Sequence, residues 1–185
     1  MNEELFEIID DVSGNVIGTA PRSRCHGDPS LIHRAVHIAV FHPDGRILLQ
    51  KRSMQKDIQP GKWDTAVGGH LMPGETYEIA AKRELQEELG VITDLPLIPL
   101  FEYKIRNERE SENVQVFSLV YAGPFKIQES ELDEIRFFEP DDLKQRMQEG
   151  GISSFTPVLQ RELELLFKDP ELLKRILTPE SEHEQ

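Results

Sequence analysis

The strongest pattern in the chain is the stretch of residues 69–91, GHLMPGETYEIAAKRELQEELGV. A loop rich in glycine and proline leads directly into Thr76–Leu89, where apolar residues recur at helical spacing. Gly90 stands where a left-handed residue commonly ends a helix. The stretch therefore predicts a loop, a helix and a second loop.

Three glutamates of the predicted helix share one face. Glu84, Glu87 and Glu88 are spaced i, i+3 and i+4, so their side chains are close enough to converge. Like charges at this spacing cost the helix roughly a few tenths of a kcal/mol per pair. A hard divalent cation such as Mg²⁺ would neutralise these oxygen ligands. The spacing alone fits a metal site and also a solvated acidic face.

Short strands are predicted on both sides of this helix. Before it we expect strands at Leu5–Ile9, Val16–Ala20, Ala35–Phe41, Arg46–Lys51 and Trp63–Gly69, and after it at Pro96–Tyr103, Val114–Tyr121 and Ile135–Phe138. Further helices are expected over Asp141–Gln148, Phe155–Phe167 and Glu171–Leu177. Strands before and after one central helix, with helices at the end, predict a mixed α/β or α+β sandwich.

Composition limits the class of protein. The chain has 185 residues, 38% apolar and 30% charged, which predicts one globular domain at 1–178 with a polar tail at 179–185. Lysine and arginine number 21 against 34 aspartate and glutamate, and a net charge of −13 disfavours nucleic acid as a partner. The sequence has no apolar run long enough to cross a membrane. The acidic N-terminus and the single Cys25 predict a cytoplasmic protein without a disulfide.

The flanks of the acidic helix carry a family resemblance. Gly69, Glu75, Arg83-Glu84-Leu85, Glu87-Glu88 and Gly90-Val91 together resemble the signature of the Nudix hydrolases at all of its fixed positions. The resemblance implies an α/β/α sandwich with a mixed β-sheet. It also implies cleavage of a diphosphate linkage in a small metabolite, such as a nucleoside diphosphate derivative, with Mg²⁺ or Mn²⁺ as cofactor.

The same resemblance implies roles for single residues. Glu84, Glu87 and Glu88 correspond to metal ligands, with the backbone carbonyl of Gly69 as a further ligand. Arg83 would orient a neighbouring carboxylate, and Glu75 would support the loop, reach the metal through water and contribute to substrate binding. Glu134 precedes a predicted strand where many Nudix members carry another catalytic glutamate, and its alternative interpretation is a surface acid.

A second resemblance lies outside this motif. The segments His33-Arg34-Ala35, Leu48–Ser53, Pro60–Trp63 and Gly69-His70 look like the isopentenyl-diphosphate isomerase branch of the same superfamily. By this resemblance, His26, His33 and His70 match the metal-binding histidines of that branch, and Glu112, expected at a hairpin tip, matches an acidic position. Three histidines and a carboxylate form a chemically sensible divalent-metal site. The alternative is that these histidines make only structural hydrogen bonds.

Two substitutions argue against isomerase activity. The isomerase needs a cysteine and a glutamate to move protons, and these positions are Gly68 and Val114 here. Neither side chain can transfer a proton. We therefore expect a hydrolase on an isomerase-like scaffold, and keep isomerisation and a non-catalytic metabolite-binding module as alternatives.

The remaining predictions concern single residues and assembly. We expect Arg52 to bind a substrate phosphate, and Trp63 to line the substrate pocket or the core. His37 and His42 are interpreted as structural. The predicted partner is a small diphosphate-containing substrate, and a homodimer through the N-terminal strands is expected.

Overall fold

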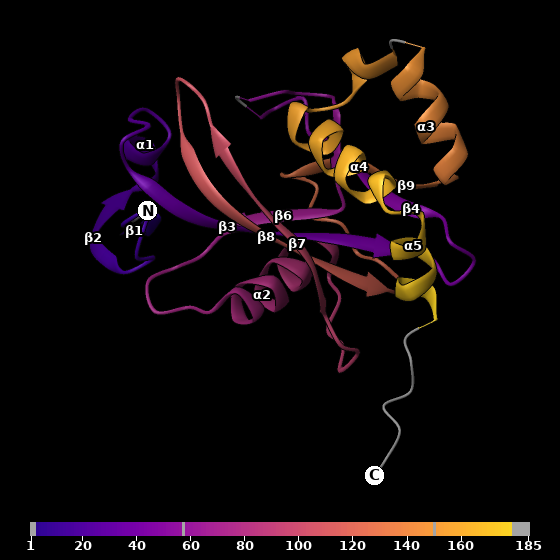
Figure 1. The fold of residues 1–185 in the computed structure, drawn as a ribbon, viewed down its shortest axis with the longest axis horizontal. Coiled ribbons are helices and arrows are strands. Elements are labelled where there is room, and N and C mark those ends of the chain that lie inside the picture. Colours follow the sequence, from indigo (N-terminus) through magenta and orange to yellow (C-terminus); the bar gives the residue numbers. More distant parts are fainter. Residues whose placement is uncertain (1–2, 57, 150, 179–185) are drawn as a thin grey trace.

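The computed structural model describes residues 3–56, 58–149 and 151–178 (Figure 1). The strands are β1 (Leu5–Ile9), β2 (Val16–Pro21), β3 (Ile32–Phe41), β4 (Ile47–Arg52), β5 (Trp63–Thr65), β6 (Val67–His70), β7 (Ile98–Arg106), β8 (Ser111–Val120) and β9 (Leu132–Phe138). The helices are α1 (Arg22–Cys25), α2 (Tyr77–Leu89), α3 (Pro140–Gln148), α4 (Pro157–Lys168) and α5 (Pro170–Leu177), with a 3-10 turn at Gly151–Ser154. The predicted tail at 179–185 lies outside the described residues.

The main sheet is mixed and forked. Its strand order is β5-β4-β3-β8-β7, with β6 paired to β3 and β9 paired to β4. The central pair, β3 and β8, is parallel, whereas the other pairs in this sheet are antiparallel. Strand β3 pairs with β6 over Ala35–Ile38 and with β4 at Val40 and Phe41. The sheet therefore forks along β3. The earlier part of β3 pairs with β6, and its last residues pair with β4, which in turn pairs with β5.

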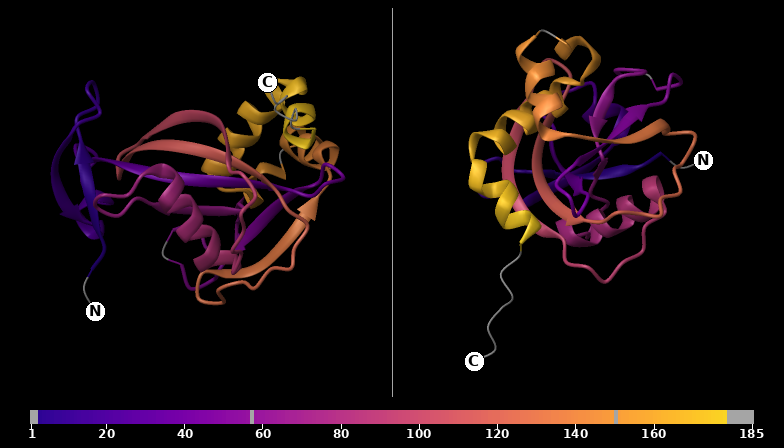
Figure 2. Two further views of the ribbon diagram at one scale, coloured as in Figure 1. Left: turned by 90° about the horizontal axis from the view of Figure 1, so that it is seen from below. Right: turned by 90° about the vertical axis from the view of Figure 1, so that its right-hand side faces the viewer.

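Helices cover both faces of this sheet (Figure 2). Alternate residues of β3, including Val36 and Ile38, belong to the core under α2 with Leu85 and Leu89. On the opposite face Phe41 packs in a second core with Leu159 and Leu163 of α4. This arrangement confirms the predicted α/β/α sandwich. Among the described residues, no helix is long and apolar enough to cross a membrane.

The motif helix forms at the predicted place. The Thr76 side chain caps α2 by accepting from the backbone N–H of Ile79, and Gly90 ends the helix at φ 64°. The predicted strand Trp63–Gly69 is instead two strands, because β5 pairs with β4 and β6 pairs with β3. This change of partner sets β5 and β6 on the two sides of the fork.

The hairpin between β7 and β8 is tighter than the sequence predicts. Asn107 closes its tip, because its side-chain oxygen accepts from the backbone N–H groups of Arg109 and Glu110. Strand β8 consequently starts at Ser111, and Glu112 is a buried strand residue rather than a tip residue. The prediction that placed Glu112 at the tip was wrong.

The N-terminal hairpin β1–β2 forms a separate two-stranded sheet at one end of the main sheet (Figure 1). The short helix α1 follows it directly. Phe6 and Cys25 pack together in a small core of their own. This end of the molecule places His26, just after α1, against β3.

Candidate functional site

Helix α2 presents the three predicted carboxylates in different environments. The Glu88 side chain is buried, Glu84 is mostly buried, and Glu87 is 51% exposed. One buried oxygen of Glu88, Oε2, has no hydrogen-bond partner among the described residues. A buried oxygen without a partner is costly, and a cation would satisfy it.

Arg83 organises the acidic cluster. Its Nε and Nη2 each donate to one carboxylate oxygen of Glu75 at 2.9 Å. Its Nη1 donates to Glu84 at 2.7 Å and to Glu87 at 3.3 Å, and its Nη2 also donates to the backbone carbonyl of His70 at 2.9 Å. A forked guanidinium suits this geometry. Arg83 therefore orients neighbouring carboxylates, as predicted, and fixes them relative to β6.

Glu75 supports the loop before α2. Besides its two bonds from Arg83, it accepts the backbone N–H of Met72 at 2.8 Å. The hydrogen bonds from Arg83 lower the pKa of Glu75. Both oxygens are thus engaged within the protein, which fits the loop support that the sequence predicts for Glu75.

Gly69 makes room for the carboxylate site. A Cβ atom on Gly69 would lie 2.0 Å from Cδ of Glu84, so no other residue fits there without moving that side chain. The close approach sets the Gly69 backbone beside the carboxylates, where the sequence predicts a carbonyl ligand.

The electrostatics of this cluster favour cation binding. Burial raises the pKa of Glu88 well above its usual value, and the charges of Glu84 and Glu131 add to the effect. Burial also raises the pKa of Glu84, although Arg83 opposes it. A divalent cation would relieve the cost of ionising these groups, and the all-oxygen donor set fits Mg²⁺.

A second cluster lies on the other face of β6. His26, His33, His70 and Glu112 each direct one ligand atom into a space where these atoms lie within 4.8 Å of one another. The parallel register of β3 and β8 places His33 opposite Glu112, and β6 brings His70. Nε2 of His70 is 2.9 Å from Glu112 Oε1, and Nε2 of His33 is 3.3 Å from the same oxygen.

The second cluster is shielded and electrostatically compensated. Phe6 stacks on His70, with the ring centroids 4.5 Å apart. Burial lowers the pKa of His26 to about 4 and also lowers the pKa of His70. Burial would raise the pKa of Glu112, but its interactions with His70 and His33 outweigh burial and hold that pKa well below its usual value. Neutral imidazoles beside an ionised carboxylate are the protonation state that binds a metal.

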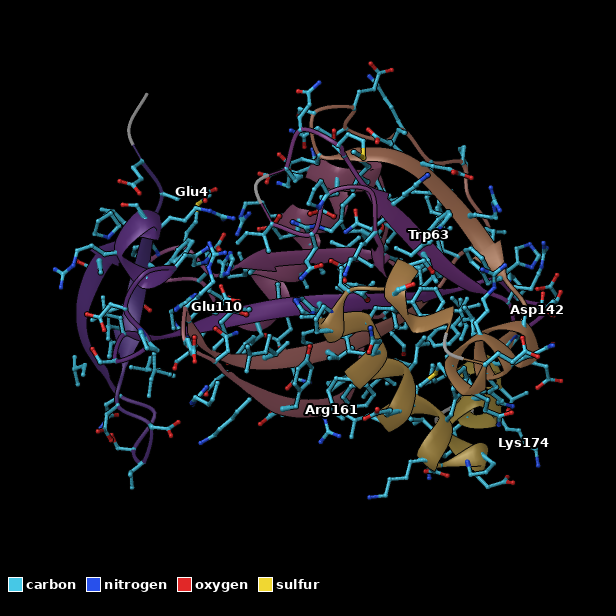
Figure 3. All side chains as sticks on the ribbon, turned by 90° about the horizontal axis from the view of Figure 1, so that it is seen from above. Glu4, Trp63, Glu110, Asp142, Arg161 and Lys174 are labelled. Atoms are coloured by element: carbon cyan, nitrogen blue, oxygen red, sulfur yellow. The ribbon has the colours of Figure 1, made fainter. Side chains whose placement is uncertain are left out.

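The second cluster also fits a metal. The buried Nε2 atoms of His26 and His33 have no well-oriented hydrogen-bond partner among the described residues. Nitrogen ligands with one carboxylate suit Zn²⁺ or Mn²⁺ better than Mg²⁺. Glu110, labelled in Figure 3 beside the N-terminal elements, lies with its carboxylate 3.9 Å from His26 Nδ1.

Three other residues predicted for the site make contacts outside the two clusters. Arg52 donates to the carbonyl of Ile58 at 3.0 Å and to Asp64 at 3.2 Å. Glu134 lies on β9 opposite Lys51 and pairs with Arg136, and no contact between it and the α2 carboxylates is found in the described part of the chain. Trp63 packs edge-on against Phe138 on the side of the sheet that carries α4 (Figure 3).

Sequence reasoning missed Asp64. This buried aspartate accepts from Arg52 and, at 2.6 Å, from the hydroxyl of Thr156, which also caps α4. Burial raises its pKa, and its charge acts on Glu88. The sequence did contain a signal for this residue. Asp64 follows Trp63 inside a predicted strand, where an acidic residue is unusual.

Comparisons with known proteins agree with this geometry. The NUDIX domain family matches residues 31–159. An uncharacterised Nudix hydrolase of Yersinia pestis is 36% identical over 154 residues, covering 83% of this chain and 80% of the relative. An isopentenyl-diphosphate Delta-isomerase of Nocardia farcinica is 31% identical over 168 residues, covering 86% and 92%.

A solved structure agrees with the fold. The DR0079 protein of Deinococcus radiodurans superposes with a TM-score of 0.74 at 23% identity, covering 87% of this chain and 98% of that one. The family match covers more than half of the chain and includes α2, with its carboxylates, and the strands around it. The chain therefore belongs to the Nudix family.

Proposed function

We propose that this chain is a Mg²⁺- or Mn²⁺-dependent hydrolase that cleaves the diphosphate linkage of a small metabolite, such as a nucleoside diphosphate derivative. The carboxylates Glu84, Glu87 and Glu88, assembled around Gly69 and Arg83, carry the proposal. The Nudix domain of Shewanella oneidensis NrtR, a protein of similar fold, was solved in complex with ADP ribose, a molecule of this class. We expect the protein to act in the cytoplasm on a freely diffusing substrate.

The residues of the proposed site have different roles. Glu84, Glu87, Glu88 and the carbonyl of Gly69 would hold the cation. When bound, such a cation screens the negative charge of a diphosphate and lowers the pKa of a coordinated water. Arg83 keeps the carboxylates aligned. Glu87 faces solvent, which suits it to accept a proton from the attacking water, whereas Glu134 is occupied by Arg136.

A substrate panel tests the proposal. The protein with Mg²⁺ is incubated with nucleoside diphosphate derivatives, dinucleotides and prenyl diphosphates, and the phosphate-containing products are measured. Turnover of one class that EDTA abolishes is expected. Tight binding of a ligand such as ADP ribose without turnover of any panel member would favour a metabolite-binding module instead.

The histidine cluster favours a second candidate function, isomerisation of isopentenyl diphosphate, since relatives named as that isomerase match most of the chain. The strands beside the cluster carry Gly68, opposite His37, and Val114, opposite Ala35. Because neither side chain can transfer a proton, we expect no dimethylallyl diphosphate from isopentenyl diphosphate. Isomer formation at enzymatic rates would reverse the order of the two candidates.

A further inference from the structure

A buried group of three polar side chains lies between β3, β7 and α4. His37 Nδ1 is 2.5 Å from Glu162 Oε1, and the hydroxyl of Tyr103 donates to the same oxygen at 2.9 Å. His37 is 8% exposed and Glu162 is 5% exposed. The pair therefore joins the central strand β3 to helix α4 through an ion pair removed from water.

Stability alone gives little reason for such a pair. A buried ion pair gains about as much from mutual attraction as it loses in desolvation, and apolar residues of the same volume often serve better. The small cavity beside Glu162 is lined mostly by apolar side chains, among them Leu49, Phe101 and Leu163. A buried charged pair with a strongly shifted pKa beside such a cavity is a candidate for a functional role.

The bond to Glu162 fixes how His37 presents its other nitrogen. Because Nδ1–H donates a hydrogen bond to the Glu162 carboxylate, Nε2 faces away from Glu162, and no described residue bonds to it. Burial pulls the pKa of His37 down, but the charge of Glu162 and its hydrogen bond outweigh burial and raise the pKa to about 9. Nε2 therefore carries a proton at neutral pH and is a hydrogen-bond donor.

Gly68 leaves this nitrogen uncovered. A Cβ atom at Gly68 would lie 3.0 Å from Cδ2 and 3.3 Å from Nε2 of His37. The φ of Gly68 is not in the left-handed region, so the backbone does not require glycine there. A side chain at this position would crowd the open edge of the imidazole. The close approach of the imidazole therefore explains the glycine, and Gly68 itself is partly exposed.

Gly68 also borders the carboxylate site. Its backbone N–H lies close enough to Glu88 to counter part of the rise in the pKa of that carboxyl, while Gly68 is paired with His37 across β3 and β6. Asp64, on the other side of the fork, acts electrostatically on both His37 and Glu88. Gly68 thus adjoins His37 on the α4 face of the sheet and Glu88 on the α2 face.

We propose that His37 contacts the substrate, with Nε2–H donating to a phosphate oxygen of the diphosphate at the fork and Glu162 acting as the positioning residue. This inference rests on the proposed function for its ligand class. It replaces the structural role that the sequence suggests for His37. The proposal adds a hydrogen-bond donor on the α4 face of the sheet to a site whose carboxylates lie on α2.

Kinetics with three variants tests the contact. His37→Asn keeps an N–H near Nδ1 for Glu162 but lacks Nε2, whereas His37→Gln reaches farther and replaces the distal N–H. Losing a hydrogen bond to a charged group predicts a KM that is roughly 10- to 100-fold higher for His37→Asn, with a smaller change in kcat. His37→Gln should recover most of the loss. His42→Asn, which alters an imidazole paired with Asp44 near the other end of β3, should match wild type.

A titration of the wild-type protein makes the test independent of turnover. Protein labelled with ¹⁵N-histidine is titrated with methylenediphosphonate in the presence of Mg²⁺, and His37 is assigned from the spectrum of His37→Gln. A shift of the His37 Nε2 resonance supports the contact, even if no substrate of the panel is hydrolysed. No shift at saturation, or a wild-type KM in His37→Asn, overturns it, even if the proposed hydrolysis is confirmed.

Discussion

The two candidate metal sites are carried by adjacent residues of one strand, yet they differ in electrostatic state. Gly69 lies beside the α2 carboxylates, and His70 belongs to the histidine cluster on the opposite face of β6. In the first site buried acids repel one another, and the pKa of Glu88 is raised. In the second, Glu112 is stabilised by histidines and its pKa is lowered.

This difference separates the roles of the two sites. The carboxylate site is costly to ionise without a cation, so cation binding there changes the charge that a diphosphate meets. The histidine cluster is already balanced and enclosed under Phe6. A metal in the cluster would brace β3, β6, β8 and the residue after α1, and hydrolysis should depend mainly on the carboxylates.

The largest expected effect is on turnover. Glu88→Gln or Glu87→Gln removes a charged ligand, and losing several kcal/mol of charge stabilisation lowers kcat by about a thousandfold or more with Mg²⁺. Steady-state assays of the best substrate measure the loss. Glu78→Gln, on an exposed position of the same helix, is the matched control and should retain wild-type activity. Wild-type turnover in both ligand variants would disprove the assignment.

A smaller effect is expected on binding of a softer ion to the second site. Calorimetry should show Zn²⁺ binding to the wild-type protein and an affinity weaker by more than about a hundredfold in His33→Ala, since one ligand is lost. Burial lowers the pKa of His26 to about 4 and also lowers the pKa of His70, so affinity should change less between pH 7.5 and 5.5 than ordinary histidines would predict. His42→Ala serves as the control. Equal affinity in His33→Ala and wild type would leave the cluster a structural one.

The smallest effect is on stability, and it should have opposite signs at the two sites. In EDTA at pH 8, Glu88→Gln should raise the melting temperature and Glu112→Gln should lower it, by about 2–4 °C per kcal/mol for a domain of this size. The physical reason is that the folded state disfavours the charge of Glu88 and favours that of Glu112.

The pH dependence provides the sign check. Glu88 binds its proton more tightly when folded, so its contribution to stability is most favourable below pH 4.5 and declines as the pH rises. Glu112 binds its proton less tightly when folded, so its contribution is present above pH 4.5 and is lost as the pH falls. Both variants should therefore approach wild-type stability in acid. Shifts of the same sign at pH 8 would contradict the comparison.

Several features followed from the sequence alone. The spacing within residues 69–91 predicts the helix, its end at Gly90 and a shared face for Glu84, Glu87 and Glu88. These features are local, because helical periodicity and capping depend on neighbours within one or two turns. The family resemblance extended this to Arg83, whose bonds to Glu75 and Glu84 connect residues that the motif already contains.

Only the tertiary structure decided the rest, because those contacts join residues far apart in the chain. The parallel register of β3 and β8 buries Glu112 beside His33, a pairing that no local spacing encodes. The fork at β3 divides Trp63–Gly69 into two strands and sets Asp64 near Glu88. The packing of α4 on β3 brings Glu162 to His37, 125 residues earlier in the chain. Strand pairing and helix packing determine which titratable groups are buried together. Those neighbours in turn determine the charge of each group.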